Sequence, residues 1–199
     1  MFARIKPVFC ATSMLFAVAS TGCGPEEMVG APGGEELSEY SQAACFRPTN
    51  YPWQQPVYTQ VKTATTLARD QICDGYVLGT QGPDTFDCSG LAYYVYRNAG
   101  FNVFRTSAQG IFNHARDQSG GVWGSLVGEW EKRAGDLIFF SPNCSESNIT
   151  HVGVYMGINL DNNKPEMVQA LNPTSGVVLS GVDNSTGLCK LSKVVRVKY

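Results

Sequence analysis

The chain has 199 residues, which predicts one folded domain and at most two. Its composition, 43% hydrophobic and 16% charged, allows a core and excludes disorder throughout, because disordered chains combine low hydrophobicity with high charge. The 15 basic and 17 acidic side chains nearly balance, which argues against a strongly basic nucleic-acid-binding protein.

The first 23 residues have the pattern of an export signal. Arg4 and Lys6 give a basic start, and residues 8–19 carry no charge. This run is too short to span a bilayer, which takes about 20 apolar residues, but it is typical of a signal-peptide core. Ala-Val-Ala at 17–19 matches a cleavage pattern for secretion, whereas the segment that ends in Cys23 resembles a bacterial lipoprotein signal with Cys23 as the lipidated residue. Either route exports the protein, as a secreted or periplasmic protein or as a membrane-anchored lipoprotein.

Residues 24–44 have the composition of a tether. Glycine and proline recur there, which disfavours regular structure, and all five charged side chains are acidic. We interpret this segment as a solvated spacer. The folded domain is then expected to occupy residues 45–199.

Helices are expected in the first half of this domain. Apolar residues recur at steps of three and four over 57–73, the pattern of an amphipathic helix. After a loop rich in glycine, a second helix is expected from Cys88 to about Ala99. Asp87 precedes it at the N-cap position, where its carboxylate can accept bonds from backbone N–H groups of the first turn. A third helix is expected over 106–117.

Strands are expected in the second half, where apolar runs alternate with turn residues. The predicted strands are 136–140, 152–158, 167–171, 176–179 and 194–199. Helices followed by strands indicate an α+β fold with an antiparallel sheet.

One cysteine stands in a context typical of a nucleophile. Cys88 follows Asp87 and opens the second predicted helix. A helix N-terminus carries about half a positive charge, which stabilises a thiolate over a thiol. A nearby imidazole would lower the pKa of the thiol further and later protonate a leaving amine, while backbone N–H groups of the first turn would stabilise a tetrahedral oxyanion.

Of the two histidines, His151 is the expected partner of Cys88. His114 lies in a polar helical stretch typical of a surface side chain, whereas His151 begins an apolar predicted strand. Gln169 is the candidate that orients the imidazole, because positions 151 and 169 share parity and strand pairing can bring both to one face. Its side-chain oxygen can accept a bond from the ring N–H. The alternative for Gln169 is an ordinary polar strand residue.

Three motifs, taken in this order, resemble the NlpC/P60 cysteine peptidases. They are Phe-Asp-Cys-Ser-Gly-Leu at 86–91, Gly-Asp-Leu-Ile-Phe-Phe at 135–140 and His-Val-Gly-Val-Tyr-Met-Gly at 151–157. The loop at 76–79 and the segment at 105–109 resemble two further segments of the same family. The resemblance covers roughly residues 57–180.

The resemblance implies a papain-like NlpC/P60 fold, in which the cysteine lies on a helix packed against a sheet that carries the other two residues. It also implies hydrolysis of amide bonds in peptidoglycan stem peptides, often the γ-D-glutamyl to diamino-acid bond. By position, Cys88 is the nucleophile and His151 the base, and Gln169 stands where many members have a second histidine. The residues at positions that shape the family's substrate site are Tyr76, Asp87 and Ser89.

Two features depart from the family pattern. Ala134 stands where a proline often precedes the Gly-Asp pair, and residues 141–150 form an insert before His151. The insert contains Cys144 and is expected to form a rim specific to this protein. Asp87 also has a purely structural alternative, that of a helix cap.

The other cysteines have separate expected roles. Cys10 is lost with the leader, and Cys23 is a candidate lipid anchor. The even set in an exported chain suggests two disulfides of open pairing, with free buried thiols as the alternative; its members are Cys45, Cys73, Cys144 and Cys189. No cysteine or histidine cluster has zinc spacing, so we expect no metal and no cofactor.

These observations together predict an exported peptidoglycan hydrolase that acts by a Cys–His thioester mechanism. The expected partners are peptidoglycan stem peptides, of its own wall or a competitor's, and a membrane where a lipid on Cys23 anchors the chain. A monomer without a nucleic-acid partner is expected. Two alternatives stay open: a Cys–His acyltransferase or amidase on another substrate, and a degenerate wall-binding module, which Gln169 favours.

Overall fold

The computed structural model describes residues 47–183 and 187–198. The predicted leader and the tether, with Cys23 and Cys45, lie outside the described residues. Within the described part, none of the helices has the length and hydrophobicity needed to cross a bilayer.

Three α-helices occupy the first half of the described chain: α1 Thr59–Asp70, α2 Cys88–Asn98 and α3 Ala108–Asp117. All three were predicted, but α1 is shorter than expected at both ends. Tyr58, before it, has an extended backbone, and Cys73, after it, has a left-handed φ of 80°. A residue in that conformation turns the chain out of a helix.

The second half forms a six-stranded antiparallel sheet in the order β3-β8-β4-β5-β6-β7. The strands are β3 Ser125–Gly128, β4 Leu137–Ser141, β5 His151–Asn159, β6 Lys164–Asn172, β7 Gly176–Gly181 and β8 Cys189–Arg196. A short 3-10 helix, η1 Glu129–Glu131, follows β3. Two further strands, β1 Gly75–Tyr76 and β2 Thr85–Phe86, pair in parallel with each other. The α+β class with an antiparallel sheet, expected from the sequence, is confirmed.

Strand β3 and the start of β8 were not predicted. The four residues of β3 are all half-buried, so they show neither the alternation of a one-sided strand nor a continuous apolar run. β8 begins at Cys189 instead of 194, and its first half contains Lys190 and Ser192. Pairing with β4, rather than local hydrophobicity, makes this half a strand.

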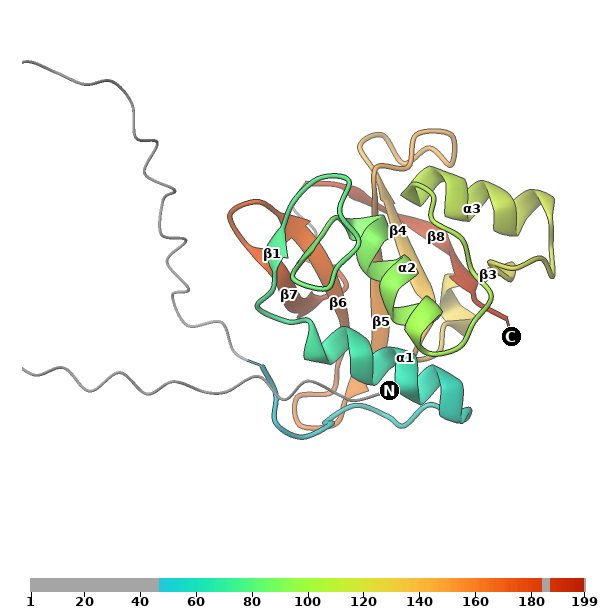
Figure 1. Ribbon diagram of the computed structural model, residues 1–199. Coiled ribbons are helices and arrows are strands. Elements are labelled where there is room, and N and C mark those ends of the chain that lie inside the picture. The colour runs from blue at the N-terminus through green and yellow to red at the C-terminus, as the bar shows by residue number, and fades with distance from the viewer. Residues whose placement is uncertain (1–46, 184–186, 199) are drawn as a thin grey trace, which may run out of the picture. The chain divides into compact units, whose positions relative to one another are not determined.

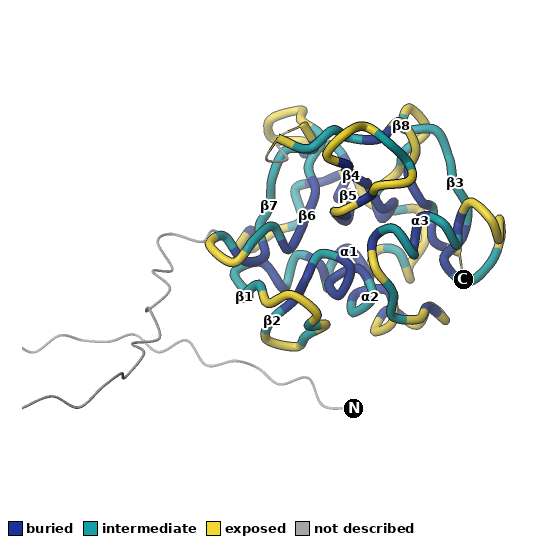
Figure 2. Tube along the Cα trace, turned by 90° about the horizontal axis from the view of Figure 1, so that it is seen from above, coloured by how far each residue is buried: buried dark blue, intermediate teal, exposed yellow. Residues whose placement is uncertain are grey.

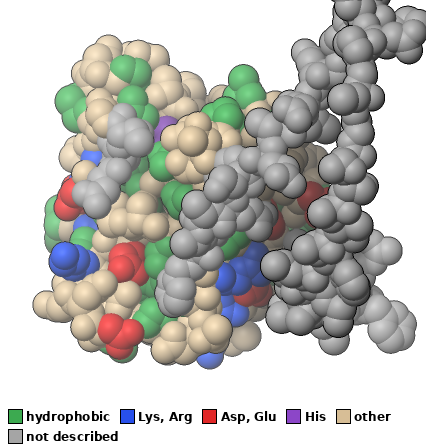
Figure 3. Space-filling view, turned by 90° about the vertical axis from the view of Figure 1, so that its left-hand side faces the viewer, with side chains coloured by type: hydrophobic (Ala, Val, Ile, Leu, Met, Phe, Trp, Pro, Cys, Tyr) green, Lys and Arg blue, Asp and Glu red, His purple; other side chains and the backbone are tan. Residues whose placement is uncertain are grey.

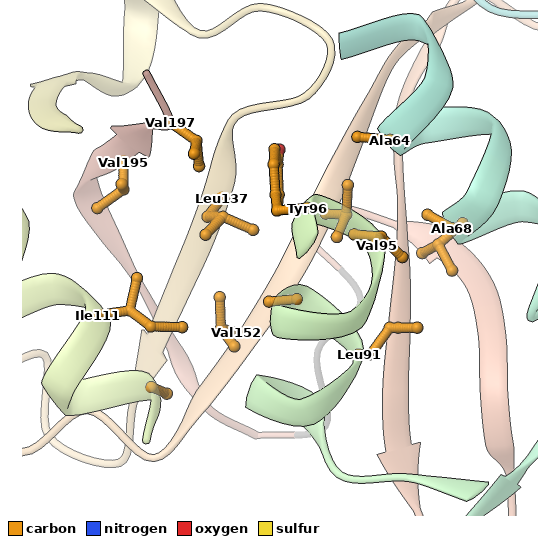
Figure 4. Packing of buried hydrophobic residues seen from close by; sticks show 14 of the residues in the cluster. Ala64, Ala68, Leu91, Val95, Tyr96, Ile111, Leu137, Val152, Val195 and Val197 are labelled. Carbon is orange, nitrogen blue, oxygen red and sulfur yellow. The ribbon is translucent and has the colours of Figure 1, made fainter. Parts of the chain in front are cut away.

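Helix α2 lies in the middle of the larger hydrophobic cluster. Figure 4 shows its apolar side chains with α1 on one side and the sheet on the other. The labelled side chains are Leu91, Val95 and Tyr96 of α2, Ala64 and Ala68 of α1, Ile111 of α3, Leu137, Val152 and Val195 of the sheet, and Val197 after β8. Alanines on α1 let the two helices approach closely. Exposed positions gather in the connecting loops, whereas the helices and strands face the interior (Figure 2). Packing of α2 in this interior therefore fixes the position of its N-terminus.

Strand β4 is buried along its whole length because both faces of the sheet are covered there. Leu137 and Phe139 belong to the cluster around α2, whereas Ile138 and Phe140 belong to a second cluster on the other face. Phe140 also pairs with His151 in the β4–β5 ladder. The first residue of β5 is therefore held by a rigid neighbour, and α2 crosses in front of this strand (Figure 1).

Candidate active site

Cys88 is the first residue of α2, and it is the free cysteine of the described residues. Its sulfur lies 3.9 Å from the carbonyl oxygen of Thr150, and the backbone N–H of Val152 acts on it as a hydrogen-bond donor. The thiol therefore lies against both chain neighbours of His151. Packing of α2 on β5 brings together the two residues that the sequence motifs single out.

Both groups are shifted toward their neutral forms. Burial raises the pKa of the Cys88 thiol, and this effect outweighs the lowering by the N–H groups of Val152 and Ser89 and by the Arg105 guanidinium. Burial also lowers the pKa of His151, against a smaller raising effect of its bond to Gln169. The helix N-terminus was expected to favour a thiolate, but in this structure desolvation dominates. Burial thus favours the thiol form of Cys88 and the neutral form of His151.

A chain of hydrogen bonds orients the imidazole. His151 Nε2 lies 2.6 Å from Gln169 Oε1, and because an amide oxygen can only accept, Nε2 carries the proton and Nδ1 keeps its lone pair. Gln169 Nε2 donates in turn to the Ser180 hydroxyl of β7 at 2.7 Å. Gly153 makes room for Met167 beside this chain, since a Cβ there would lie 2.9 Å from the Met167 sulfur and in ordinary contact with the Gln169 Cβ. Ser180 was not among the sequence-predicted residues.

Asp87 is the centre of a buried polar network behind the nucleophile. One carboxylate oxygen accepts bonds from the Gly90 N–H at 2.6 Å and the Ser89 hydroxyl at 2.9 Å. The other accepts from the Gly79 N–H at 2.8 Å and from the Arg105 guanidinium at 2.6 Å. Arg105 also donates to the Ser89 hydroxyl at 2.7 Å. All four interactions with Asp87 are internal, so Asp87 and Ser89 can shape the site by positioning α2, the loop before it and Arg105.

Gly90, in the Cys-Ser-Gly sequence at 88–90, is needed because the backbone of the β1–β2 loop approaches it closely. A Cβ on Gly90 would lie 2.0 Å from the Thr80 carbonyl oxygen, and Thr80 also accepts the Asp87 N–H. The β1–β2 loop therefore packs directly against the first turn of α2 and is hydrogen-bonded to the residue before it. Tyr76 of β1 lies close enough to Cys88 and Asp87 for both to raise its pKa, although burial is the larger cause.

A sequence model of the NlpC/P60 family matches residues 74–196. The chain belongs to the NlpC/P60 family. Membership had been predicted from the motifs and is confirmed.

Known NlpC/P60 proteins match parts of this chain. "Probable endopeptidase p60" of Listeria monocytogenes is 36% identical over 90 residues, which are 45% of this chain and 16% of that protein. "Bifunctional muramidase/DL-endopeptidase CwlT" of Bacillus subtilis is 39% identical over 83 residues, 41% of this chain and 22% of that protein. This chain thus spans less than a quarter of either relative. The solved structure of the peptidoglycan hydrolase RipB of Mycobacterium tuberculosis matches with 26% identity and a TM-score of 0.51, covering 70% of this chain and 66% of RipB.

The insert of this NlpC/P60 chain is held next to His151 by contacts that sequence reasoning missed. Gln109 of α3 donates to the Glu146 carbonyl at 2.9 Å and accepts the Ile149 N–H at 2.7 Å. Glu146 also pairs with Lys193 of β8 at 3.1 Å. Gln109 belongs to the segment that resembles the family, which was its only signal; nothing in the sequence pointed to its partners, because they depend on how the insert folds back.

Two cysteines of the predicted disulfide set are bonded to each other in the structure. Cys144 of the insert is joined to Cys189 of β8 across a sequence separation of 45 residues. Cys73 is disulfide-bonded too, whereas Cys45, the fourth member of the predicted set, lies outside the described residues.

The second histidine lies apart from this network. His114 is half-buried on α3 with its ring edge-on to Phe104 at 5.2 Å, so the surface position expected for it is wrong in part. Within the described ranges, no group of three histidine, cysteine or acidic side chains could hold a metal ion. On the face shown in Figure 3, basic and acidic side chains lie interspersed among uncharged ones.

Proposed function

We propose that this protein is an exported cell-wall hydrolase that cleaves amide bonds in peptidoglycan stem peptides. The observation that carries the proposal is the free thiol of Cys88 at the start of α2, lying against the strand that begins with a hydrogen-bonded His151. The names of CwlT and RipB, a DL-endopeptidase and a peptidoglycan hydrolase, support this substrate class. The specific bond that we propose is the one between D-glutamate, through its γ-carboxyl group, and the diamino acid.

The proposed first stage transfers the acyl group to the enzyme. His151 Nδ1 takes the thiol proton as the Cys88 sulfur attacks the amide carbonyl carbon, which becomes a tetrahedral oxyanion. First-turn N–H groups of α2 would stabilise this oxyanion; the N–H of Ser89 already acts on the sulfur. The C–N bond then breaks, the amine leaves with the proton held by His151, and a thioester remains.

The proposed second stage releases the acyl group. With the amine gone, His151 Nδ1 takes a proton from water, and the oxygen attacks the thioester carbonyl carbon. The C–S bond breaks, Cys88 leaves as thiolate and recovers the proton from His151. Gln169 holds the ring in one tautomer throughout, because its oxygen accepts the Nε2 proton.

We propose that Tyr76 contributes to substrate binding directly, whereas Asp87 and Ser89 act by positioning. Tyr76 is half-exposed beside Cys88. Asp87 and Ser89 are buried, each 5% exposed, and are bonded to each other and to Arg105.

Export is proposed from the leader pattern, with lipid anchoring at Cys23 or cleavage after Ala19 as the two routes. An oxidising compartment fits the bonded Cys144, Cys189 and Cys73. We propose Cys45 as the partner of Cys73.

Mass spectrometry of products from defined muropeptides tests the function. The expected product pair is a fragment ending in D-glutamate and a fragment beginning with the diamino acid, and the variant Cys88→Ala should release neither. Thr63→Ala is the control, since it truncates an exposed side chain of α1 and leaves the nucleophile in place. Products joined to an added amine would favour the acyltransferase. Binding to sacculi without any product, by protein of intact fold, would favour the wall-binding module.

A further inference from the structure

A cavity of about 580 Å³ lies away from Cys88. It is bordered by the end of α2, η1 and the segment after it, the end of β5 and the end of β8. Tyr96, which lines it, is eight residues along α2 from Cys88, about 12 Å at the helical rise. None of its lining residues belongs to the site described above. Its volume is in the range of sites for small organic ligands.

Large apolar side chains at this cavity are open to water. Trp130 of η1 is 86% exposed and Val57 is 84% exposed, whereas the other two tryptophans, Trp53 and Trp123, are fully buried. Exposed apolar groups that border a hollow are typical of binding sites. A flat indole offers a stacking surface for the C–H face of a sugar ring.

The cavity is also basic. Its lining includes four cations and one acid; the cations are Lys132, Arg133, Arg196 and Lys198, and the acid is Asp136. Asp136 is buried and paired with Arg196 at 2.8 Å, so its charge is neutralised locally. Among the described residues, neither Arg133 nor Lys198 has an acidic partner. The Arg133 side chain acts on Asp136 only through space, and Lys132 is paired with Glu129. A ligand with carboxylates would therefore find its cationic partners in Arg133 and Lys198.

We propose that this cavity binds stretches of the glycan strand whose sugars have lost their stem peptides, stacking a sugar ring on Trp130 and pairing the lactyl carboxylates freed there with Arg133 and Lys198. The proposal rests on the proposed function, because it takes the same polymer as substrate. It adds a second point of attachment, separate from the catalytic residues, through which the enzyme would hold the strand while a stem peptide reaches Cys88.

The fluorescence of Trp130 provides a direct test, because Trp53 and Trp123 are buried and shielded from a soluble quencher. Acrylamide quenching is measured on the Cys88→Ala protein with glycan strands stripped of their stem peptides. We expect the strands to protect Trp130, and a neutral chitin oligosaccharide of equal length to bind about fivefold more weakly because it lacks carboxylates. The variant Arg133→Ala should remove about half of this difference in binding free energy, because Lys198 remains. Arg116→Ala, which removes the same charge from an exposed position on α3, should leave the difference unchanged. Unchanged quenching at saturating strand concentration would overturn the proposal.

Turnover separates this proposal from the proposed function. For Trp130→Ala in otherwise active enzyme, the ratio of cleavage of sacculi partly stripped of stem peptides to cleavage of a free stem peptide should fall about tenfold, as for loss of an aromatic anchor. An unchanged ratio overturns the second site and leaves the function standing. A wild-type enzyme that cleaves neither substrate overturns the function, whereas protection of Trp130 by glycan would still support the site. Circular dichroism of each variant checks that the fold is intact.

Discussion

At the scale of single residues, the decisive feature is the protonation of Cys88 and His151. Burial shifts the pKa of both groups toward their neutral forms, which fits the proposed mechanism, in which the proton passes from sulfur to Nδ1 during the attack on substrate. An enzyme of this kind depends on the basicity of the imidazole at the moment of reaction. Its pH dependence therefore reports on His151 alone at the acid end.

The acid limb of the pH–rate profile is expected below pH 6.5. His151 must be neutral to accept the thiol proton, and its pKa is lowered from 6.5 by burial, so activity should persist below that pH and fall as His151 becomes protonated. The measurement is kcat/KM for a defined muropeptide as a function of pH. Iodoacetamide should alkylate Cys88 slowly at pH 6 and faster as the pH rises, because the thiol pKa is raised. Equally fast alkylation at pH 6 and pH 9 would instead indicate a preformed thiolate–imidazolium pair.

Replacing Gln169 should reduce activity without unfolding the protein. In Gln169→Ala the ring Nε2–H loses its acceptor, and the tautomer with a free Nδ1 is no longer enforced. We expect kcat to fall about tenfold to a hundredfold, equivalent to about 1.5–3 kcal/mol for a lost hydrogen bond. The acid limb should also move to lower pH, because the bond to Gln169 raises the pKa of His151.

Replacing Ser180 should have a weaker effect of the same kind as replacing Gln169. Ser180→Ala removes only the support of the Gln169 amide, so its effect should have the same sign and be smaller. An equal loss of kcat in both variants with no movement of the acid limb would indicate general damage to β6 and β7 instead of a lost orienting bond.

Sequence reasoning reached the residues whose type and local context carry the chemistry. Cys88 follows a capping Asp87 and opens a helix, which is a local signal, and Gln169 could be placed near His151 by strand parity alone. Ser180 and Gln109 could not be found in this way, since each matters only through a partner on another element. Their partners depend on the strand register and on how the insert folds back, which local pattern does not determine.

At the scale of elements, the catalytic helix and the loop before it form one unit. The loop reaches α2 through the Thr80 carbonyl and the Gly79 N–H, and Asp87 joins both to the helix. The two short strands β1 and β2 frame this loop. The position of Cys88 is thus determined by the loop as well as by the packing of α2 against the sheet.

A methyl group at Gly90 should break this unit. Gly90→Ala would place a Cβ 2.0 Å from the Thr80 carbonyl oxygen. A side-chain rotation cannot relieve this clash, because the oxygen is a backbone atom and the Cβ is fixed to the backbone, so the loop must move. We expect a loss of about 3 kcal/mol of unfolding free energy, the upper part of the range for overpacking, and a loss of most activity. Chemical denaturation and the muropeptide assay measure the two effects.

Gly100→Ala is the matched control for that variant. Gly100 follows α2, has a φ of +92° and has open space around its Cβ position. Only the cost of a left-handed backbone, about 1 kcal/mol, is expected there, with activity retained. Equal destabilisation by the two substitutions would show that the close contact at Thr80 does not matter.

At the scale of the whole molecule, the insert is attached to distant parts of the chain. Residues 141–150 are bonded covalently to β8 through Cys144 and Cys189, and hydrogen-bonded to α3 through Gln109. The segment that leads into His151 is therefore held from two sides. The redox state of the Cys144–Cys189 disulfide should therefore influence both the stability and the activity of the protein.

Loss of the Cys144–Cys189 bond should destabilise the protein moderately. Closing a loop of this size is worth about 2–4 kcal/mol in the chain-entropy model, so the double variant Cys144→Ser with Cys189→Ser should unfold at lower temperature. We expect reduced activity as well, because the insert precedes His151 directly. Thermal unfolding with and without dithiothreitol is the measurement: the reductant should lower the Tm of the parent protein by more than that of the double variant. Identical shifts in both would contradict this assignment.

The position of β8 also has a consequence for how the chain must fold. β8 pairs with β3 on one side and with β4 on the other, where Val195 lies opposite Leu137. Within the sheet, β3 pairs only with β8. Neither β3 nor this edge of β4 can therefore pair before β8 is present. While the chain is being delivered, β4 to β7 can associate in sequence order, but one edge of β4 stays open until residues 189–196 arrive. An open strand edge is a template for association with other chains. A chain halted before residue 189 should therefore aggregate instead of accumulating as a partly active enzyme, and the sheet closes only once the final strand is inserted between its neighbours.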